Sequence, residues 1–279
     1  MPRLLIAGCG YVGSAAARLF LHDGWQVTAW SRSGKIHDGN EPPGSLSVRA
    51  VNLGDPDDVQ RNSFPCDVVV HCASTSGGSA DEYRRVYRDG VRNLLAAFPA
   101  ARVIFTSSTS VYGQRDGSWV DENSPAEAAS EKAKILREAE ELILRHAGIV
   151  LRLGGIHGPG RSFLLQAVLS GRISAGRDRY VNGIHRDDAA AAIHLVITKP
   201  PSRNGIFNVV DDTPALRSEI VAFLAKQLRR PLPQPAPRSS PRDDSNKRVS
   251  NAKLRALGWV PRYPSYTEGF CQSVLVTPA

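Results

Sequence analysis

The sequence predicts an α/β fold, a doubly wound parallel sheet covered by helices on both faces and followed by a smaller C-terminal lobe. Three observations lead to this prediction. Short apolar segments alternate with segments of helical spacing through the first half of the chain, as expected for strands buried on both faces. A glycine-rich turn joins the first apolar segment to the first helix. Beyond residue 153 the alternation loosens, so we expect residues 1–153 to form one domain and residues 154–279 a lobe that shares strands with it.

Short, mainly apolar segments mark the expected strands of the first domain. They are residues 3–7, 26–30, 47–51, 67–72, 102–106 and 149–153. The helices between them carry apolar residues three and four positions apart. They are expected at residues 11–22, 56–61, 81–98 and 130–145. In the lobe, helices are expected at 163–169, 187–197 and 214–228, a strand at 205–210, a proline-rich linker at 231–241 and short helices within 251–270.

The composition narrows the classes of partner. The net charge is +8, and ten of the basic residues lie within residues 226–262, against two acids. No aromatic residue lies among them before Trp259, so a surface that stacks nucleic-acid bases is not favoured. Two interpretations of this basic segment remain. It covers a bound anionic small molecule, or it is a basic surface exposed to solvent.

No apolar run approaches the ~20 residues that span a membrane. The four cysteines form no Cys-x-x-Cys pair, so no metal site is expected. We therefore expect a cytoplasmic protein that acts on a small, anionic molecule without a membrane or nucleic-acid partner.

The glycine-rich turn reads Gly8-Cys9-Gly10-Tyr11-Val12-Gly13. Between a strand and a helix, this spacing is typical of a Rossmann-type dinucleotide site. Gly8 permits the tight turn, Gly10 lets the backbone approach a pyrophosphate, and Gly13 lets the helix pack closely on the sheet. The helix N-terminus adds free N–H groups and a partial positive charge.

The end of the second strand indicates which dinucleotide is bound. An NAD site usually has an Asp or Glu there, which binds the ribose 2′-hydroxyl. This sequence has Ser31-Arg32-Ser33 instead. A guanidinium suits a 2′-phosphate, so NADP is favoured over NAD.

These motifs, together with several others in a fixed order, resemble the extended short-chain dehydrogenase/reductases, which include NAD-dependent epimerases and dehydratases. The resemblance covers nearly the whole chain. Besides the glycine loop, it is carried by residues 67–73 (DVVVHCA), 105–113 (FTSSTSVYG), 151–160 (LRLGGIHGPG), 185–189 (HRDDA) and 207–212 (FNVVDD), and by the sequence LGW at 257–259.

The resemblance implies a set of cofactor contacts: Gly8, Gly10, Tyr11, Val12, Gly13, Arg32, Asn52, Leu53, Ala73, Ser74 and Lys134. Within this set, Arg32 is expected at the adenosine ribose or its phosphate. Asn52 and Leu53 are expected beside the adenine, and Ala73 and Ser74 beside the cofactor ribose. Ser108 matches the catalytic Ser or Thr of the family.

The sequence departs from the family at its Tyr-x-x-x-Lys motif, in which tyrosine is the acid/base and lysine holds the nicotinamide ribose and lowers the tyrosine pKa. Lys134 fits the lysine position, and Ser130 then stands where tyrosine is expected. None of the seven tyrosines is followed by a lysine four residues later. A serine hydroxyl is far less acidic than a phenol, so the chain resembles an atypical, YeeZ-like subgroup in which this motif is degenerate.

Three interpretations follow from this departure. The first is an oxidoreductase, epimerase or dehydratase that acts on an anionic sugar-like or small carbonyl substrate with another acid/base, for which the candidates are Tyr112, Tyr180, His157 and His185. The second is an NADP-binding redox sensor or scaffold without turnover. The third is an enzyme in which Ser108 and Lys134 bind substrate while water or a substrate group moves the proton.

Two further expectations concern partners. Four arginines could clamp a phosphate or carboxylate: Arg161, Arg186, Arg242 and Arg248. Many members of the family dimerise through the helices that correspond to residues 81–98 and 130–145, so a homodimer is also expected.

Overall fold

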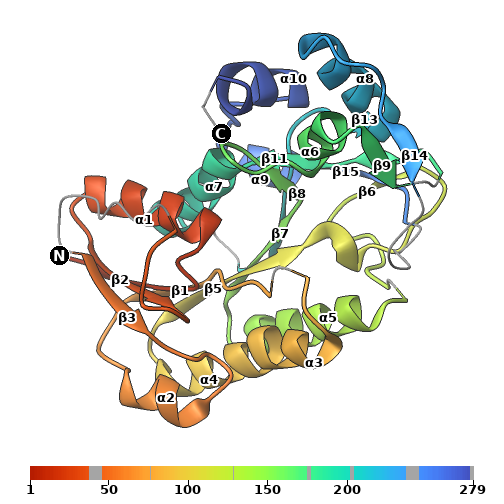
Figure 1. Cartoon of the computed structure of the whole chain (residues 1–279). Helices are drawn as coiled ribbons and strands as arrows, with labels where there is room; N and C mark the ends of the chain where they lie inside the picture. The colour runs from red at the N-terminus through yellow and green to blue at the C-terminus, as the bar shows by residue number, and fades with distance from the viewer. Residues whose placement is uncertain are drawn as a thin grey trace.

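The computed structural model describes residues 1–37, 46–75, 77–127, 129–174, 177–201, 204–236 and 245–276. Its centre is a parallel seven-stranded sheet in the order β12-β7-β5-β4-β1-β2-β3 (Figure 1). The strands are β1 (Arg3–Ala7), β2 (Gln26–Ser31), β3 (Leu46–Ala50), β4 (Val68–His71), β5 (Arg102–Ser108), β7 (Ile149–Leu153) and β12 (Ile206–Val209). The predicted fold class is confirmed.

Helices cover both faces of this sheet because its strands are apolar on both sides. In β1, Leu4 and Ile6 join one buried cluster, and Leu5 and Ala7 join the other. The first cluster packs under α1 (Tyr11–His22) and α7 (Arg186–Thr198), and the second under α2 (Pro56–Arg61), α4 (Gly90–Ala97) and α5 (Glu131–Arg145). Figure 1 shows these two helical layers above and below the sheet.

Two predicted helices have a different form in the structure. The segment expected at 81–98 comprises α3 (Ala80–Tyr83), the π-helical η1 (Arg84–Asp89) and α4. It begins at a capping box in which the Ser79 hydroxyl and the Glu82 side chain each bond the other residue's backbone N–H. The helix expected to include Ser130 begins one residue later, because the Ser130 hydroxyl accepts a hydrogen bond from the N–H of Ala133 as its N-cap.

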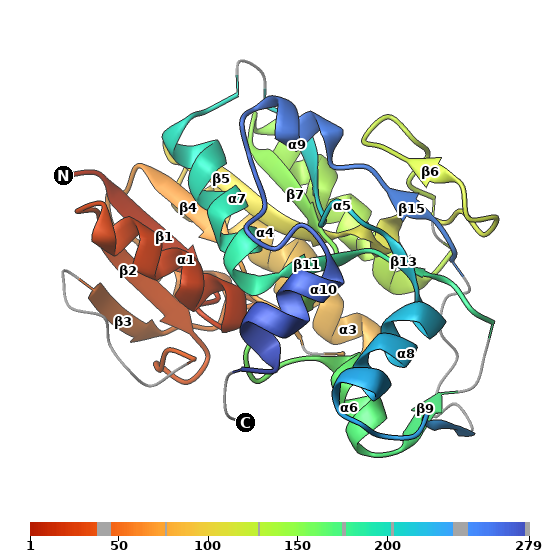
Figure 2. The ribbon, with the colours of Figure 1, turned by 90° about the horizontal axis from the view of Figure 1, so that it is seen from above.

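The C-terminal lobe is built from short elements around a third apolar cluster, which contains residues of α6 (Phe163–Leu169), α8 (Arg217–Gln227), α10 (Tyr266–Gly269) and η3 (Phe270–Val274). Figure 2 shows α6, α8 and α10 at one side of the central sheet. The parallel pair β8 (Gly155–His157) and β11 (Gly183–His185) leads from the sheet into this lobe. The remaining short elements are η2 (Thr109–Val111), β6 (Trp119–Val120), β9 (Arg172–Ser174), β10 (Tyr180–Val181), β13 (Ala215–Leu216), β14 (Gln234–Ala236), β15 (Arg248–Val249) and α9 (Ala252–Ala256).

Pairing between distant segments accounts for the differences in this lobe. The helix expected from residue 214 begins at Arg217, because residues 215–216 pair with β10. Part of the predicted linker, residues 234–236, pairs with β9, and its residues 237–241 lie outside the described part of the chain. The last strand of the central sheet, β12, comes from beyond residue 153. The division at residue 153 itself stays a prediction. In the described ranges, no helix combines the length and apolar character needed to cross a bilayer.

Candidate functional site

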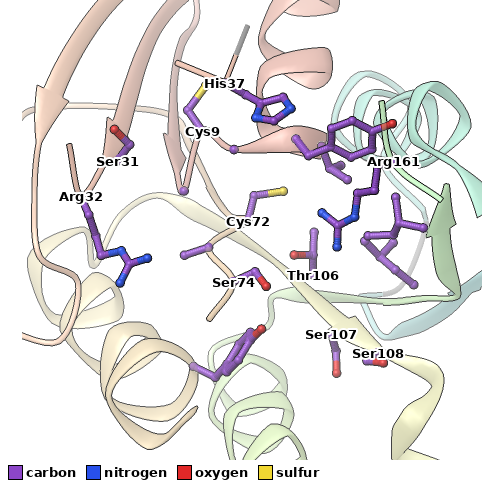
Figure 3. A pocket seen from close by; sticks show the side chains of 18 of the residues that line it. Cys9, Ser31, Arg32, His37, Cys72, Ser74, Thr106, Ser107, Ser108 and Arg161 are labelled. Carbon is purple, nitrogen blue, oxygen red and sulfur yellow. The ribbon is translucent and has the colours of Figure 1, made fainter. Parts of the chain in front are cut away.

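A cleft of about 650 Å³ opens where β1, β2, β4, β5 and β7 end. The carboxyl ends of parallel strands are where ligands bind in open α/β sheets. The glycine loop, the end of β2 and the end of β4 line one part of the cleft, and Thr106, Ser107, Ser108, Leu136 and Arg161 line another. Figure 3 shows Arg32 and Ser31 at one end of the cleft and Arg161 at the other.

The glycine loop is shaped by two close backbone approaches. Gly8 has a φ of 102°, and a Cβ built on it would lie 2.1 Å from the backbone nitrogen of Ala73. A Cβ on Gly13 would lie 2.5 Å from the carbonyl oxygen of Gly8. A Cβ on Gly10, in contrast, has nothing within 4 Å, and no side chain caps α1 at Gly10. The space beside Gly10, at a helix N-terminus without a side-chain cap, fits the pyrophosphate of a dinucleotide.

We expect Gly10→Ala to separate binding from folding. The methyl group meets no protein atom, so the free energy of unfolding should stay within about 1 kcal/mol of the wild type. It would occupy the space that a pyrophosphate needs, so cofactor affinity should fall by roughly tenfold or more, equivalent to about 1.4 kcal/mol.

Gly8→Ala provides the comparison, because its Cβ would overlap the backbone of Ala73. This variant should lose several kcal/mol of stability, about 3 or more. Urea unfolding and cofactor titration by tryptophan fluorescence measure the two effects. Unchanged cofactor binding by a folded Gly10→Ala protein would contradict the assignment of the loop.

The end of β2 gives the cleft its charge. The Ser31 hydroxyl donates to the carbonyl oxygen of Lys35 at 2.8 Å and accepts from the Lys35 N–H at 3.0 Å. This closes a turn from which the exposed Arg32 enters the cleft. Arg32, Lys35 and Arg161 are among the lining residues, whereas none of the described lining residues is an Asp or Glu. The cleft is therefore electropositive.

The other predicted cofactor contacts divide into two groups. Ala73 and Ser74 line the cleft. Asn52 and Leu53 do not belong to the described lining: Asn52 accepts a hydrogen bond from the N–H of Gly54 within a turn, and Leu53 is buried in the apolar core under the sheet. The Asn52 side chain is therefore bonded within a local turn, and the place of these two residues beside the adenine stays a prediction.

Of the predicted catalytic residues, Ser108 lies in the cleft and Tyr112 lies outside it. The Ser108 hydroxyl accepts from the N–H of Ser110 at 3.1 Å, so it caps η2 while it lines the cleft. Tyr112 is fully buried, and its hydroxyl donates to Asn208 Oδ1 at 2.9 Å. Burial also raises the pKa of the Tyr112 phenol. Tyr112 therefore has a structural partner and no opening to the cleft.

The predicted pair Ser130 and Lys134 is not brought to the cleft. Ser130 is the N-cap of α5, and Lys134 lines a separate shallow hollow together with Arg137 and Glu138. The residue of α5 that lines the cleft is Leu136. Residues four apart share a helix face, so the residue one turn earlier on the cleft-facing side is Lys132. The prediction that Lys134 faces the cofactor is at odds with this helical phase.

A buried ion pair adjoins the cleft. The Arg152 guanidinium donates to both carboxylate oxygens of Glu140, at 2.9 and 2.7 Å, and both side chains are at most 1% exposed. The hydroxyl of Ser107, a lining residue, also donates to Glu140, at 2.7 Å, and Arg137 donates to it at 2.5 Å. This network joins β5, α5 and β7. Sequence reasoning missed it, because Glu140 stands in a helix rich in glutamate and nothing in the pattern distinguishes it.

A second cavity of about 370 Å³ lies in the C-terminal lobe and shares Ile156 with the cleft. Apolar side chains including Phe163, Leu164 and Phe270 line it, and a few polar groups converge on it: His157, Ser162, Arg179, Asp211, Thr213 and Arg217. An apolar pocket with a small number of converging polar groups is the usual form of a ligand site. Sequence reasoning missed Arg179 and Arg217, because surface arginines are common and nothing in the sequence placed them at one cavity.

Burial controls the charge of two groups in this cavity. It lowers the pKa of His157 to about 4, so the imidazole is neutral at neutral pH. His157 Nε2 is buried with no hydrogen-bond partner in the described structure. Burial also raises the pKa of Asp211 well above its usual value. In the described structure, this cavity is therefore lined by a neutral imidazole with an unpaired ring nitrogen and by a carboxyl group whose pKa is raised.

The other acid/base and arginine candidates from the sequence do not gather at one site. His185 is buried and bonds the Ser273 hydroxyl at 2.9 Å. Tyr180 packs against Arg248, whose guanidinium also lies over Trp119. Arg161 and Arg186 lie over the ring of Tyr11, at 5.3 and 5.1 Å from its centroid. Arg242 is outside the described residues. The described residues contain no group of three or more His, Cys, Asp or Glu side chains suited to a metal ion.

The comparisons with known proteins agree with this architecture. The sequence model of the family described as NAD dependent epimerase/dehydratase matches residues 4–209. Protein YeeZ of Escherichia coli K12 is 29% identical over 252 residues, covering 84% of this chain and 86% of YeeZ. A solved structure from Methylobacillus flagellatus, assigned as an NAD-dependent epimerase/dehydratase, is 32% identical with a TM-score of 0.76, and 96% of each chain is covered.

A third comparison extends the likeness in fold. The complex of UDP-glucose 4-epimerase from Thermus thermophilus with NAD has a TM-score of 0.79 at 22% identity, with 96% of each chain covered. The family match spans more than half of the chain and includes the glycine loop, the strand ends that form the cleft, and β12. The chain belongs to the NAD-dependent epimerase/dehydratase family.

Proposed function

We propose that this chain is an NADP-dependent oxidoreductase that reduces a small anionic carbonyl or sugar-like compound. The observation that carries the proposal is the charge of the cleft. Arg32 and Lys35 stand at the end of β2, and no described lining residue is acidic. An acid at this position would bind a ribose 2′-hydroxyl, whereas a guanidinium flanked by hydroxyls suits a 2′-phosphate.

The proposal gives each part of the cleft a role. The glycine loop and the N-terminus of α1 bind the pyrophosphate, Arg32 binds the 2′-phosphate, and Ala73 and Ser74 lie along the ribose. When bound, the cofactor supplies hydride chemistry at its nicotinamide ring. Ser108 lines the cleft at the end of β5, and its hydroxyl orients the substrate oxygen by a hydrogen bond.

The second cavity is the proposed substrate chamber. It adjoins the cleft through Ile156, so a substrate held there extends toward the cofactor site. Arg179 and Arg217 attract an anionic group, and the aromatic lining covers an apolar or sugar portion. The Thermus relative is a UDP-glucose 4-epimerase, which supports testing nucleotide sugars first. A second copy of the chain, paired through the face formed by α3, α4 and α5, is the other partner that we propose.

Transfer of a labelled hydride tests this function. Purified protein is incubated with NADPH deuterated at nicotinamide C4 and with a panel of nucleotide sugars, 2-oxo acids and 3-oxo acids. We expect mass spectrometry to find deuterium in at least one product. The control is Gly10→Ala, which should bind the cofactor weakly and transfer less. Tight NADPH binding without transfer to any compound would favour the alternative function, a redox sensor or scaffold that binds NADP without turnover.

A further inference from the structure

The cleft contains tyrosines, although the sequence lacks the Tyr-x-x-x-Lys motif. Those that line it are Tyr11, Tyr83 and Tyr87. The Tyr11 hydroxyl donates to the carbonyl oxygen of Pro159 at 2.9 Å. Tyr87 is 8% exposed and packs against His71 and Phe105. Tyr83 is half-buried, so it is more accessible than Tyr11 and Tyr87, which are each 8% exposed.

Tyr83 is also the tyrosine that meets a lysine. The Nζ atom of Lys132 lies 5.0 Å from the centroid of the Tyr83 ring. The same ammonium donates to the carbonyl oxygen of Gly77 at 3.3 Å, which fixes it beside the loop that follows β4. Lys132 stands one helical turn before Leu136, on the side of α5 that reaches the cleft.

An ion pair between η1 and α5 links the segments next to the two side chains. Arg84, which follows Tyr83, pairs with Glu131, which precedes Lys132. Arg84 also bonds Asp81 at 2.6 Å. The π-helical segment η1 begins directly after Tyr83, and π-helical insertions occur frequently at functional sites. The contact between Tyr83 and Lys132 is therefore supported from both helices.

We propose that Tyr83 is the proton donor of the reaction and that Lys132 is its positioning residue, so that a tyrosine–lysine pair is assembled from two helices instead of one. This inference rests on the proposed reductase function. It also explains why a tyrosine is not needed at position 130. Tyr83 takes the acid/base role, and Ser130 caps α5.

The chemistry balances as a carbonyl reduction. The substrate carbonyl carbon gains a hydride, for which the reduced nicotinamide of the proposed function is the source. The O–H bond of Tyr83 breaks, and its proton forms the new O–H bond of the alcohol. The Tyr83 phenolate then regains a proton from water. The nearby Lys132 ammonium stabilises the phenolate while it exists.

The surroundings keep this phenol protonated before the reaction. Burial raises the pKa of Tyr83, and the neighbouring Tyr87 raises it further. The titratable groups that face the Tyr83 ring are Tyr87 of η1, with ring centroids 4.9 Å apart, and Lys132 of α5. The phenol is therefore protonated at neutral pH, and the role of the Lys132 ammonium is to oppose this rise in pKa so that the proton can pass to the substrate.

The first test needs neither substrate nor cofactor. The pKa of Tyr83 is measured by NMR on protein labelled with ¹³C at the tyrosine Cζ, with the signal assigned by its loss in Tyr83→Phe. We expect Lys132→Met to raise this pKa by half a unit or more, because a nearby positive charge is removed. Lys134→Met, two residues along the same helix, should leave it unchanged. A Tyr83 pKa that does not respond to Lys132→Met would overturn the pairing.

The second test measures the role in turnover. With a compound that the wild type reduces, Tyr83→Phe should lower kcat by roughly 100-fold or more, the usual contribution of a general acid, while the NADPH dissociation constant stays within about threefold. Tyr180→Phe, which changes a tyrosine outside both cavities, should keep wild-type turnover. Wild-type turnover by Tyr83→Phe would refute the inference. Failure of the wild type to bind NADPH would instead refute the proposed function, and the NMR titration would still decide the pairing.

Discussion

Arg32→Ala should weaken NADPH binding by roughly 10- to 100-fold, while NADH affinity changes by less than about threefold. The guanidinium stands in a cleft whose described lining contains no acid, so its removal leaves a 2′-phosphate without its charge-assisted bonds. NADH has no 2′-phosphate and loses little. Fluorescence titration of both cofactors against wild type and variant measures the ratio.

Arg61→Ala is the matched control for this substitution. Arg61 lies on α2, its side chain is 66% exposed, and its ion pair with Asp58 is on the surface. It should change neither affinity. An equal loss of NADPH and NADH binding in Arg32→Ala would remove the basis for preferring NADP, because the arginine would then act on a part that both cofactors share.

The largest effect on stability is expected at the buried ion pair. Glu140→Ala should lower the free energy of unfolding by about 3–5 kcal/mol, because it leaves the Arg152 guanidinium buried without a countercharge. Both groups are at most 1% exposed, and Arg152 Nη1 already has no hydrogen-bond partner in the described structure. Urea unfolding monitored by circular dichroism measures the change.

The adjacent residue provides the control. Glu141 pairs with Arg145 at 3.4 Å on the exposed side of α5, and such surface pairs contribute about 0–1 kcal/mol. Glu141→Ala should therefore be close to wild type in stability. If Glu140→Ala were as stable as Glu141→Ala, the buried network could not be what holds α5 against β5 and β7.

The sequence predicts the sheet well because its strands obey one simple rule. A strand buried on both faces is a continuous apolar run, and residues 4–7 and 68–70 show this plainly. The glycine loop is equally easy to predict. At Gly8 and Gly13 another part of the backbone lies so close that a side chain would not fit. The strands of the lobe, such as β10 and β13, have two residues each and arise from tertiary pairing that no local pattern records.

The side of the cleft that α5 lines is harder to predict from the sequence, because it depends on which face of the helix points inward. Matching the family motif at Lys134 displaces the assignment by two residues from Lys132 and Leu136, and two residues correspond to about 200° of rotation on a helix. Motif spacing and the lining of the cleft therefore indicate different sides of α5. The contact of Lys132 with Tyr83 joins residues 49 positions apart, from two helices, and a pattern of spacing along one segment cannot reveal it.

The position of β12 has a consequence for synthesis of the chain. The strand β7 ends at Leu153, but its outer neighbour β12 begins only at Ile206. At roughly 5–20 residues per second on the ribosome, the outer edge of β7 stays unpaired for several seconds. An unpaired apolar strand edge can bind the strands of other chains. The nascent protein is therefore exposed to aggregation through this edge in the interval between these two strands, and the Tyr112 hydroxyl gains its partner Asn208 only when that interval ends.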